Sequence, residues 1–576
     1  MRAAGGMRRA AIALGLAALG VVCLLAYVQR AAIHQQLFDL TGEEGWLQQI
    51  HAMGLLASDV IRPSLDLQPE VPIAYNGVNP FGINTFLQQE VEPAKRERQV
   101  ALIAAAGFHW LRQEFPWYDI EVGGKGNFND CRNPPKCISA WDKYDQIVSL
   151  AESHGLELMV RLSSPPDWSR ADGAARGAFA PPDHYSDFAD YAAAVATRYR
   201  GRVHYYQVWN EPNIYAEWGN QPVDPEAYTR LLCQTYQRLK QVDPTIVVIS
   251  GVLAPTAELG AVNDAGGNNL NDYIFLQRMY AAGARPCFDV MSVQGYGLWS
   301  GPTDHRMRPL LVNYGRNQFI RDVMVANGDG NKAIWISEMN WNTVPPDSGI
   351  PTQFGQVTEA QQASYAPLAY QRAQADWPWV GMNAFWYFKK ADDSERNQPV
   401  YYFRMANPDF TLLPVYDAMK AYTHQTPVMY PGWFQQDHWA VTWTGDWQTT
   451  ADPQAVLGAE KVTRTPGASA KFVFDGNELL LVTRRDPQAG SISVQVDQRP
   501  AVTFDLTAPA PAWGVKLPVI SGLPAGQHQV EIVSLNGVNA INGFIVRRTP
   551  DLTLPFLVAI MASIGLSYYV IRRRLA

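Results

Sequence analysis

Between about residue 72 and residue 425, short apolar runs alternate with longer amphipathic stretches, and this alternation constrains the fold most strongly. Short apolar runs bounded by turn residues predict buried strands, and apolar residues repeating every three or four positions predict helices. The expected strands are residues 81–86, 109–115, 157–162, 203–209, 246–252, 289–296, 333–338 and 381–388. The expected helices are residues 93–106, 140–154, 184–200, 225–242, 270–283, 310–326, 359–377 and a short stretch at 413–422.

Strand–helix pairs repeated in this way over about 350 residues are typical of an α/β protein with a (β/α)8 barrel, or TIM barrel. An open, doubly wound sheet would give the same alternation. That alternative usually carries a glycine-rich phosphate loop after its first strand, and no such loop follows residues 81–86. The sequence therefore favours a barrel, which we place at residues 71–428.

After residue 428 the helical periodicity ends and the sequence becomes rich in short strand-like runs. Glycine and proline turns separate these runs, a pattern that is typical of an all-β sandwich. The clearest runs are residues 470–474, 478–483, 492–496 and 529–535. We therefore expect an accessory β-sandwich domain at residues 429–549, which either binds glycan or braces the barrel.

The N-terminal segment is predicted to span a membrane. Residues 10–28 are almost entirely apolar and follow Arg2, Arg8 and Arg9. A run of this length can cross the roughly 30 Å hydrocarbon core of a bilayer. It is either a secretory signal or an uncleaved anchor, and the lack of a small-residue cleavage site favours the anchor. We assign residues 1–30 to this segment.

A second apolar run, residues 552–572, ends at the arginines 572–574 and predicts a C-terminal transmembrane helix. Arginines flanking spans usually lie on the cytoplasmic side, so both ends are expected in the cytoplasm. The lipid bilayer would then be a partner, with the barrel on the extracytoplasmic side of the cell membrane. Residues 31–70 are expected to form a juxtamembrane helix and linker.

The net charge and the cysteines limit the kinds of function that this protein can have. The net charge of -7 is spread without basic blocks, which argues against nucleic-acid binding. Cys131 and Cys137 bracket a short proline-rich turn, and this spacing suggests a loop disulfide in an oxidising compartment. Cys233 and Cys287 are interpreted as buried thiols, with a second disulfide as the alternative. No Cys-x-x-Cys pair suggests a metal site.

Candidate functional residues come from the strand ends, because the active site of a (β/α)8 barrel lies at the carboxyl ends of its strands. Glu211 directly follows the strand 203–209 and Asn210, and Pro212 then blocks further ladder pairing. Glu338 ends the apolar strand 333–338. The other polar or aromatic residues at predicted strand ends are Arg112, Asn210, Gln294, Tyr296 and Trp386.

Two carboxylates that face each other across a cleft are the groups that glycoside hydrolysis requires. One protonates the leaving oxygen, and the other, when close, attacks the anomeric carbon. Arg112 and Tyr296 would stabilise an ionised Glu338, while apolar surroundings would keep Glu211 protonated. A plain buried ion-pair site is the structural alternative for this pair.

The remaining candidates would contact the sugar. Asn210 would bind the 2-hydroxyl, a contact that strengthens in the transition state. Trp386 would form the floor beneath the ring. Aromatic residues that follow predicted strand ends suggest a cleft with several sugar subsites, or else belong to the core: Trp117, Trp168, Tyr215, Trp218, Trp299 and Trp341. Of these, Trp341 is assigned to substrate binding.

The run Trp-Asn-Glu-Pro-Asn at 209–213, together with Ile-Ser-Glu at 336–338, resembles the clan of retaining (β/α)8 glycoside hydrolases. Within that clan the pattern is most similar to glycoside hydrolase family 39, and the resemblance covers about residues 75–425. It implies that Glu211 is the acid/base and Glu338 the nucleophile. It also implies supporting roles for Asn210, Arg112, Tyr296 and Trp386.

One residue departs from the clan's pattern. Many members carry a histidine two residues before the tyrosine of strand six, and this chain has Gln294 there. Glutamine can form hydrogen bonds but cannot titrate. The network around the nucleophile and the choice of substrate are therefore expected to differ.

The function expected from the sequence is a membrane-anchored retaining glycoside hydrolase that cleaves β-linked glycans by double displacement, without a metal or organic cofactor. Its substrate would be an oligosaccharide, a polysaccharide or a glycolipid. A non-catalytic glycan-binding protein, acting as a scaffold in polysaccharide assembly, is the alternative from another class. A transglycosylase would use the same residues and differ only in its acceptor.

Overall fold

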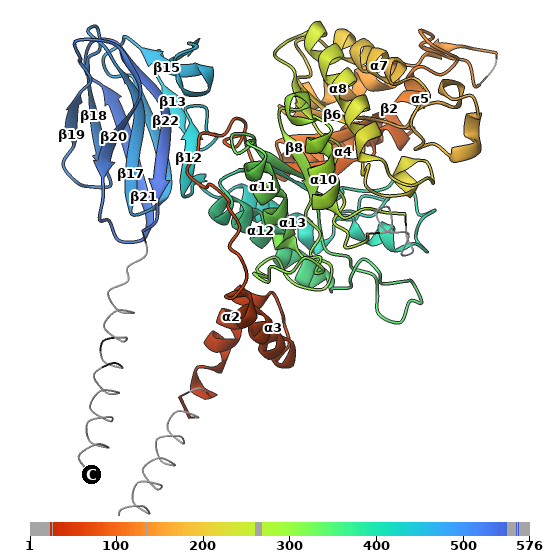
Figure 1. Ribbon diagram of the computed structural model, residues 1–576, viewed down its shortest axis with the longest axis horizontal. Helices are drawn as coiled ribbons and strands as arrows, with labels where there is room; N and C mark the ends of the chain where they lie inside the picture. Colours follow the sequence, from red (N-terminus) through yellow and green to blue (C-terminus); the bar gives the residue numbers. More distant parts are fainter. Residues whose placement is uncertain are drawn as a thin grey trace, which may run out of the picture. The chain divides into compact units, whose positions relative to one another are not determined.

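The computed structural model describes residues 24–549, apart from residues 26, 134 and 260–267, together with residues 560 and 563. The chain forms two compact units, Met1–Gln425 and Thr426–Ala576. The first unit contains the alternating strands and helices, and the second contains antiparallel strands (Figure 1).

Eight parallel strands form the centre of the first unit, and each of them except the fifth forms a continuous ladder with the next along the chain or, for the last, with the first. They are β1 (Phe81–Thr85), β2 (Trp110–Pro116), β5 (Glu157–Ser163), β6 (Tyr205–Val208), β7 (Val247–Ile249), β8 (Met291–Gln294), β9 (Ile334–Met339) and β10 (Val380–Phe385). The first strand, β1, also pairs with the last, β10. Bridges Ile249–Val290 and Leu253–Val293 join β7 to β8, so the ring of strands is closed.

Helices follow the strands and surround them (Figure 1). They are α4 (Pro93–Ala105), α6 (Asp142–Ser153), α7 (Tyr185–Arg198), α8 (Pro225–Val242), α10 (Asp272–Ala281), α11 (Asn317–Ala326), α12 (Glu359–Asp376) and α13 (Pro414–Thr423). Local sequence fixes several of their starts. Proline begins α4, α8 and α13, where its missing N–H is not needed. A capping box of Thr358 and Gln361 begins α12.

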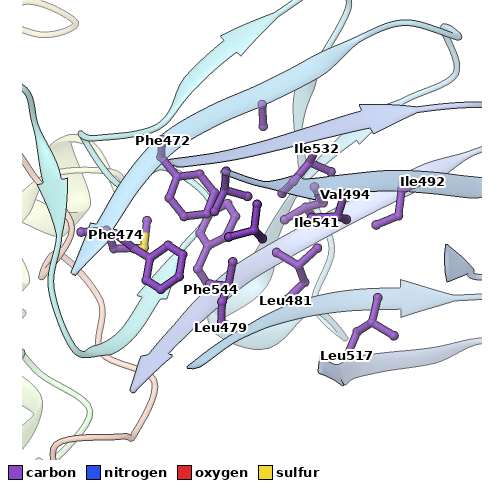
Figure 2. Close-up of a cluster of buried hydrophobic side chains, with 14 of the residues drawn as sticks. Phe472, Phe474, Leu479, Leu481, Ile492, Val494, Leu517, Ile532, Ile541 and Phe544 are labelled. Carbon is purple, nitrogen blue, oxygen red and sulfur yellow. The ribbon is translucent and has the colours of Figure 1, made fainter. Parts of the chain in front are cut away.

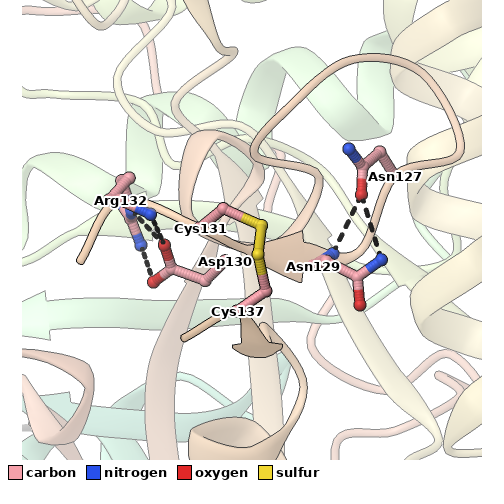
Figure 3. Close-up of a disulfide and its surroundings, with 6 residues drawn as sticks. All are labelled: Asn127, Asn129, Asp130, Cys131, Arg132 and Cys137. Carbon is pink, nitrogen blue, oxygen red and sulfur yellow. Dashed lines mark hydrogen bonds and ion pairs between the residues drawn. A yellow bond between two sulfur atoms is a disulfide. The ribbon is translucent and has the colours of Figure 1, made fainter. Parts of the chain in front are cut away.

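A long excursion follows β2. It contains α5 (Trp117–Ile120) and a small hairpin of β3 (Asn129–Asp130) and β4 (Ile138–Ser139). A disulfide between Cys131 and Cys137 closes the tip of this hairpin, beside the ion pair of Arg132 with Asp130 (Figure 3). A hydrophobic core alone cannot hold such a small hairpin, so the covalent link supplies its order.

A second disulfide joins Cys233 on α8 to Cys287, which lies in the turn before β8. The expectation that these two residues are free thiols is therefore wrong. Their separation of 54 residues hides the pairing in the sequence, because only the packing of α8 beside this turn brings the cysteines together.

The residues before the barrel form two helices, α2 (Arg30–Thr41) and α3 (Trp46–Asp59), joined by a tight turn at Gly42. This hairpin packs on barrel loops. Gly301 donates its backbone N–H to the Gly42 carbonyl at 2.6 Å, and Tyr365 on α12 donates to Glu44 at 2.6 Å. The expected linker is thus an ordered part of the first unit.

The second unit is a β-sandwich of two sheets. One sheet contains β11 (Val428–Met429), β13 (Thr442–Thr444), β16 (Ser469–Gly476), β18 (Ser491–Val496), β19 (Val502–Asp505) and β21 (Gly526–Ser534). The other contains β12 (Gly432–Gln435), β14 (Gln448–Ala451), β15 (Ala459–Thr463), β17 (Glu478–Arg485), β20 (Ala512–Ile520) and β22 (Asn539–Arg547). Figure 2 shows the shared core, in which Phe472, Leu481 and Phe544 are buried.

The fold class requires one correction. The expected transmembrane helices at 1–30 and 552–572 lie almost wholly outside the described residues. Among the residues that the structure describes, no helix is both long enough and apolar enough to cross a bilayer. Over the described residues, the architecture is a (β/α)8 barrel followed by a β-sandwich.

Candidate active site

Arg112 on β2 is the centre of the site at the mouth of the barrel. Its side chain is 3% exposed, and its N–H groups reach four neighbours. The guanidinium donates to Gln207 on β6 at 2.7 Å, Asn84 on β1 at 2.8 Å, Asn210 at 2.8 Å and Glu338 at 2.6 Å. Because these partners come from different strands, Arg112 fixes the strand ends relative to one another.

Glu338 lies near the end of β9, where the pairing with β8 shifts in register. Such an irregularity re-aims side chains at a strand end. Three donors converge on the carboxylate: Arg112 at 2.6 Å, the Tyr296 hydroxyl at 2.9 Å and the Gln294 side-chain amide at 2.9 Å. Charge-assisted hydrogen bonds of this kind fix the orientation of the carboxylate.

Glu211 and Glu338 accept hydrogen bonds from the same donor, the side chain of Gln294. The side-chain nitrogen of Gln294 donates one hydrogen to Glu338 and another to Glu211. Since each hydrogen bond spans about 3 Å, the nearest oxygens of the two carboxyl groups lie at most about 6 Å apart. The two glutamates, which are distant in the chain, therefore share one small space.

The backbone turns sharply where Glu211 is presented. The strand β6 ends at Val208, and Trp209 and Glu211 then adopt φ angles of 80° and 33°. Residues other than glycine rarely occupy this left-handed region and do so only where neighbours hold them. Here the Trp209 N–H donates to the Leu162 carbonyl at 2.8 Å, and its indole N–H donates to the Glu217 carbonyl at 2.9 Å.

Burial, followed by the negative charges of Glu217 and Glu338, raises the pKa of Glu211 to about 8. The hydrogen bond from Gln294 and the charge of Arg112 act in the opposite direction but do not prevail. Glu211 is thus protonated at neutral pH and can donate a proton, as a general acid must.

Beside the two glutamates lies a small hollow whose lining includes Phe86, Arg112, Glu114, Arg161 and Trp386. Trp386 is half-buried, and its ring meets that of Phe86 edge to face, with centroids 5.5 Å apart. Glu114 and Arg161 form an ion pair at 2.7 Å. The hollow has aromatic and fixed polar groups in its lining, but its volume of about 10 Å³ leaves room for about one water molecule.

Trp341 does not reach this hollow. Its ring is fully buried, packs against Tyr314 and Tyr365, and donates its indole N–H to the Ser300 carbonyl at 2.7 Å. Trp341 therefore has no exposed surface that could make the expected contact with substrate.

The other loop aromatics divide in the same way. Trp117 and Trp218 are buried, whereas Trp168 and Tyr215 are half-buried and Trp299 is 60% exposed. Position after a strand end thus does not distinguish a subsite ring from a core ring.

Several residues of the site were not predicted. Asn84, Glu114 and Arg161 lie at the ends of β1, β2 and β5, so the strand-end rule would have found them had it been applied to every strand. Gln207 within β6 and Glu217 in the following loop carry no such signal. Gln207 donates to Ser292 at 2.7 Å beneath the site, inside the barrel.

No family model matches the sequence. One curated relative, described as an A type blood alpha-D-galactosamine galactosaminidase from Flavonifractor plautii, is 31% identical over 105 residues. This match covers 18% of the chain and 10% of the relative, so the chain spans only a tenth of that protein.

Solved structures match over a longer stretch. A family 39 glycoside hydrolase from Bacteroides cellulosilyticus WH2 has 16% identity and a TM-score of 0.43, covering 81% of this chain and 82% of that one. A monomeric beta-xylosidase from Caulobacter crescentus CB15 has 14% identity and a TM-score of 0.43, covering 82% and 99%. A family 39 enzyme from Xanthomonas axonopodis pv. citri has 16% identity and a TM-score of 0.43, covering 82% and 96%.

The chain is similar to glycoside hydrolases of family 39. Likenesses at this level of identity and TM-score do not define an activity.

Proposed function

We propose that the protein is a retaining glycoside hydrolase, with Glu211 as the acid/base and Glu338 as the nucleophile. The observation that carries this proposal is the shared donor Gln294, which brings the two carboxyl groups within about two hydrogen-bond lengths. Retaining enzymes have carboxyl groups about 5 to 5.5 Å apart, whereas inverting enzymes leave room for a water between them.

In the first step, Glu211 protonates the glycosidic oxygen while an oxygen of Glu338 attacks the anomeric carbon. The bond to the leaving group breaks, and a glycosyl ester forms on Glu338. The ester is neutral, so the negative charge of Glu338, which had raised the pKa of Glu211, is removed. The ionised Glu211 then accepts a proton from water, which attacks the anomeric carbon and releases the sugar with its original configuration.

We propose a β-linked carbohydrate as the substrate, as the resemblance of the Asn-Glu-Pro motif at 210–212 implies. The half-buried ring of Trp386, near Arg112, supports this proposal by offering an aromatic face to a sugar. A panel of paired α- and β-linked aryl glycosides would test the configuration. Hydrolysis of the α-linked members alone would contradict this part of the proposal.

A 2-fluoroglycoside with a good leaving group tests the mechanism directly. It should form a stable ester with the enzyme, and mass spectrometry of the digested protein should place the label on Glu338. Proton NMR of the first product should show the configuration of the substrate. A label on another residue, or inversion of the anomeric centre, would contradict the proposal, and sugar acceptors that increase product yield would indicate transglycosylation.

We also propose that the enzyme works outside the cytoplasm. The disulfides Cys131–Cys137 and Cys233–Cys287 support this location, because such bonds persist in oxidising compartments. Alkylation of free thiols in freshly lysed cells, followed by mass spectrometry, should find these cysteines protected. Modification of all four would contradict the proposed location.

A further inference from the structure

The β-sandwich carries a cavity on the outer face of one of its sheets. In this sheet β21 lies between β16 and β18. Successive side chains of a strand point to opposite faces of the sheet. Phe472 on β16 and Ile532 on β21 lie in the core (Figure 2). Their neighbours Lys471 and Glu531 therefore lie on the outer face, where they line a cavity of about 340 Å³, a volume within the range of small-molecule sites.

Strand register sets polar side chains in a row across the floor of this cavity. Thr442 on β13 pairs with Lys471, and Lys471 pairs with Glu531. Glu531 pairs in turn with Gln495 on β18, and all four residues line the cavity. Neighbouring strands lie about 4.8 Å apart, so the row is about 14 Å long. The floor is therefore elongated and polar along its length.

The side chains of this row offer hydrogen-bond donors and acceptors next to one another. Lys471 and Glu531 form an ion pair at 3.0 Å, in which their side chains remain 58% and 39% exposed. A pair this exposed adds little to the free energy of unfolding, and both of its groups remain open to a ligand. The ammonium group donates, the carboxylate accepts, and the amide of Gln495 can do both.

An aromatic side chain, Trp439, forms part of the wall of the cavity. It lies in the turn before β13, between His438 and Ala440. The His438 ring is buried and meets the Phe434 ring edge to face, with centroids 4.6 Å apart. Burial lowers the pKa of His438 to about 3, so the neutral ring accepts the Ala440 N–H at its Nδ1, at 3.2 Å. The turn is thus fixed from the core, while Trp439 is half-buried and borders the cavity.

The lining favours an uncharged ligand that is rich in hydroxyl groups. Its one ammonium group, on Lys471, faces two carboxylates, on Asp497 and Glu531, so its formal charge is -1 and it repels anions. Sugar hydroxyl groups both donate and accept hydrogen bonds, which matches the mixed groups of the floor. An aromatic wall beside a few polar groups is typical of ligand sites, and the elongated floor suits several sugar units in line.

We propose that this cavity is a second carbohydrate site, which binds a neutral oligosaccharide across β16, β21 and β18 with Trp439 beside a sugar ring. The site would hold the protein on a glycan without cleaving it. This inference goes beyond the proposed hydrolase function and does not depend on it, because every residue of the lining belongs to the second unit.

Two substitutions remove different parts of the site. Trp439→Ala removes the aromatic wall, and Gln529→Ala removes an exposed amide of the lining. The matched controls lie on the other sheet. Trp513→Ala on β20 removes a half-buried indole, and Gln448→Ala on β14 removes an exposed amide. Thermal unfolding followed by circular dichroism checks that each variant keeps the fold.

The measurement is isothermal titration calorimetry on the full chain carrying Glu338→Gln, so that the barrel does not consume the probe. The probes are cellohexaose, xylohexaose, mannohexaose and laminarihexaose, with hexagalacturonate as the anionic comparison. We expect at least one neutral probe to bind, with a Kd that rises about tenfold or more in Trp439→Ala. Gln529→Ala should raise the same Kd about fivefold, whereas the two controls should leave it unchanged.

Hydrogen–deuterium exchange of the full chain locates the bound probe. The neutral hexasaccharide should slow exchange in peptides that contain residues 437–444 and 526–534, and Trp439→Ala should remove this protection. Slower exchange in the barrel strands would report separately on binding at the proposed active site.

The outcomes decide the proposal by themselves. Failure of all four neutral probes to bind, or binding that is unchanged in both Trp439→Ala and Gln529→Ala, would overturn it. Tighter binding of hexagalacturonate at this cavity would contradict a neutral ligand. Weaker binding in a folded Gln529→Ala supports the site even where Trp439→Ala does not fold. A barrel that is inactive on every glycoside would overturn the proposed hydrolase function and leave this result standing.

Discussion

The ends of β6 and β9 carry the same chemical group in different surroundings. At the end of β9, Glu338 is 3% exposed, and its carboxylate accepts hydrogen bonds from Arg112, Tyr296 and Gln294. After β6, Glu211 is half-buried, lies on a strained turn and accepts from Gln294. After burial, the largest influences on its pKa are the negative charges of two further carboxylates, Glu217 and Glu338.

This difference shows how one residue type acquires two roles. Donors that converge on a carboxylate hold it as a fixed anion, whereas burial beside other negative charges keeps a carboxyl group protonated. Gln294 belongs to both environments, because its NH2 group bridges the two. The division of labour between the proposed nucleophile and the proposed acid therefore comes from their neighbours.

The largest expected effect on kcat comes from substitution of Glu338 on β9. Glu338→Gln preserves the size of the side chain but removes the attacking oxygen, and we expect kcat to fall about 10⁵-fold or more. Steady-state hydrolysis of an activated aryl glycoside measures this loss, and circular dichroism confirms that the fold is intact. Retention of more than about a tenth of the wild-type kcat would refute the assignment of the nucleophile.

After β6, the loss of activity in Glu211→Gln should depend on the leaving group of the substrate. Poor leaving groups need a proton, so we expect a loss of about 10³-fold with them. Good leaving groups need none, so formation of the glycosyl ester should remain fast and its hydrolysis should become limiting. Azide, which needs no general base, should then restore turnover. Equal losses for both kinds of substrate would show that Glu211 is not the acid/base.

Substitution of Gln294, which bridges the two glutamates, should have a smaller effect on activity and should shift the pKa of Glu211 in a predictable direction. Donation from Gln294 lowers the pKa of Glu211, so Gln294→Leu should raise it and move the basic limb of the pH profile upward. The lost donor to Glu338 should also reduce kcat about tenfold. Gln374→Leu on α12, outside this network, is the matched control. A downward shift in Gln294→Leu would contradict the shared-donor geometry.

The smallest effect is on stability. The folded protein holds the Glu211 proton up to a pKa of about 8, whereas the unfolded chain releases it near 4.5. The free energy of unfolding should therefore fall as the pH rises between these values. Urea unfolding across this range should show a shallower decline in Glu211→Gln. The control Glu152→Gln, which removes an exposed carboxylate paired with Arg202, should keep the wild-type decline. An unchanged slope in Glu211→Gln would show that its proton is not retained on folding.

Sequence alone placed most of the fold. The predicted strand at 157–162 is found as β5 (Glu157–Ser163), and the helix predicted at 225–242 is α8 (Pro225–Val242). These elements follow from local periodicity and from caps, which do not depend on distant parts of the chain. The predicted strand 203–209 is shorter as β6, because the chain turns at Trp209.

The candidate site was predicted to the extent that strand ends meet at one face of a barrel. That rule places Glu211 and Glu338 together without knowledge of any side-chain contact. It does not distinguish Trp341, whose ring is buried, from Trp386, whose ring borders the hollow. Both follow strand ends, and only the packing of the loops decides which ring remains accessible.

By itself the sequence determined the helices and strands, and it determined that Glu211 and Glu338 lie at strand ends. Both follow from periodicity and proline positions, which act over a few residues. Tertiary structure decided the rest. The pairing of Cys233 with Cys287 and the four partners of Arg112 depend on strand register and loop packing. Such contacts join residues far apart in the chain, so no local pattern encodes them.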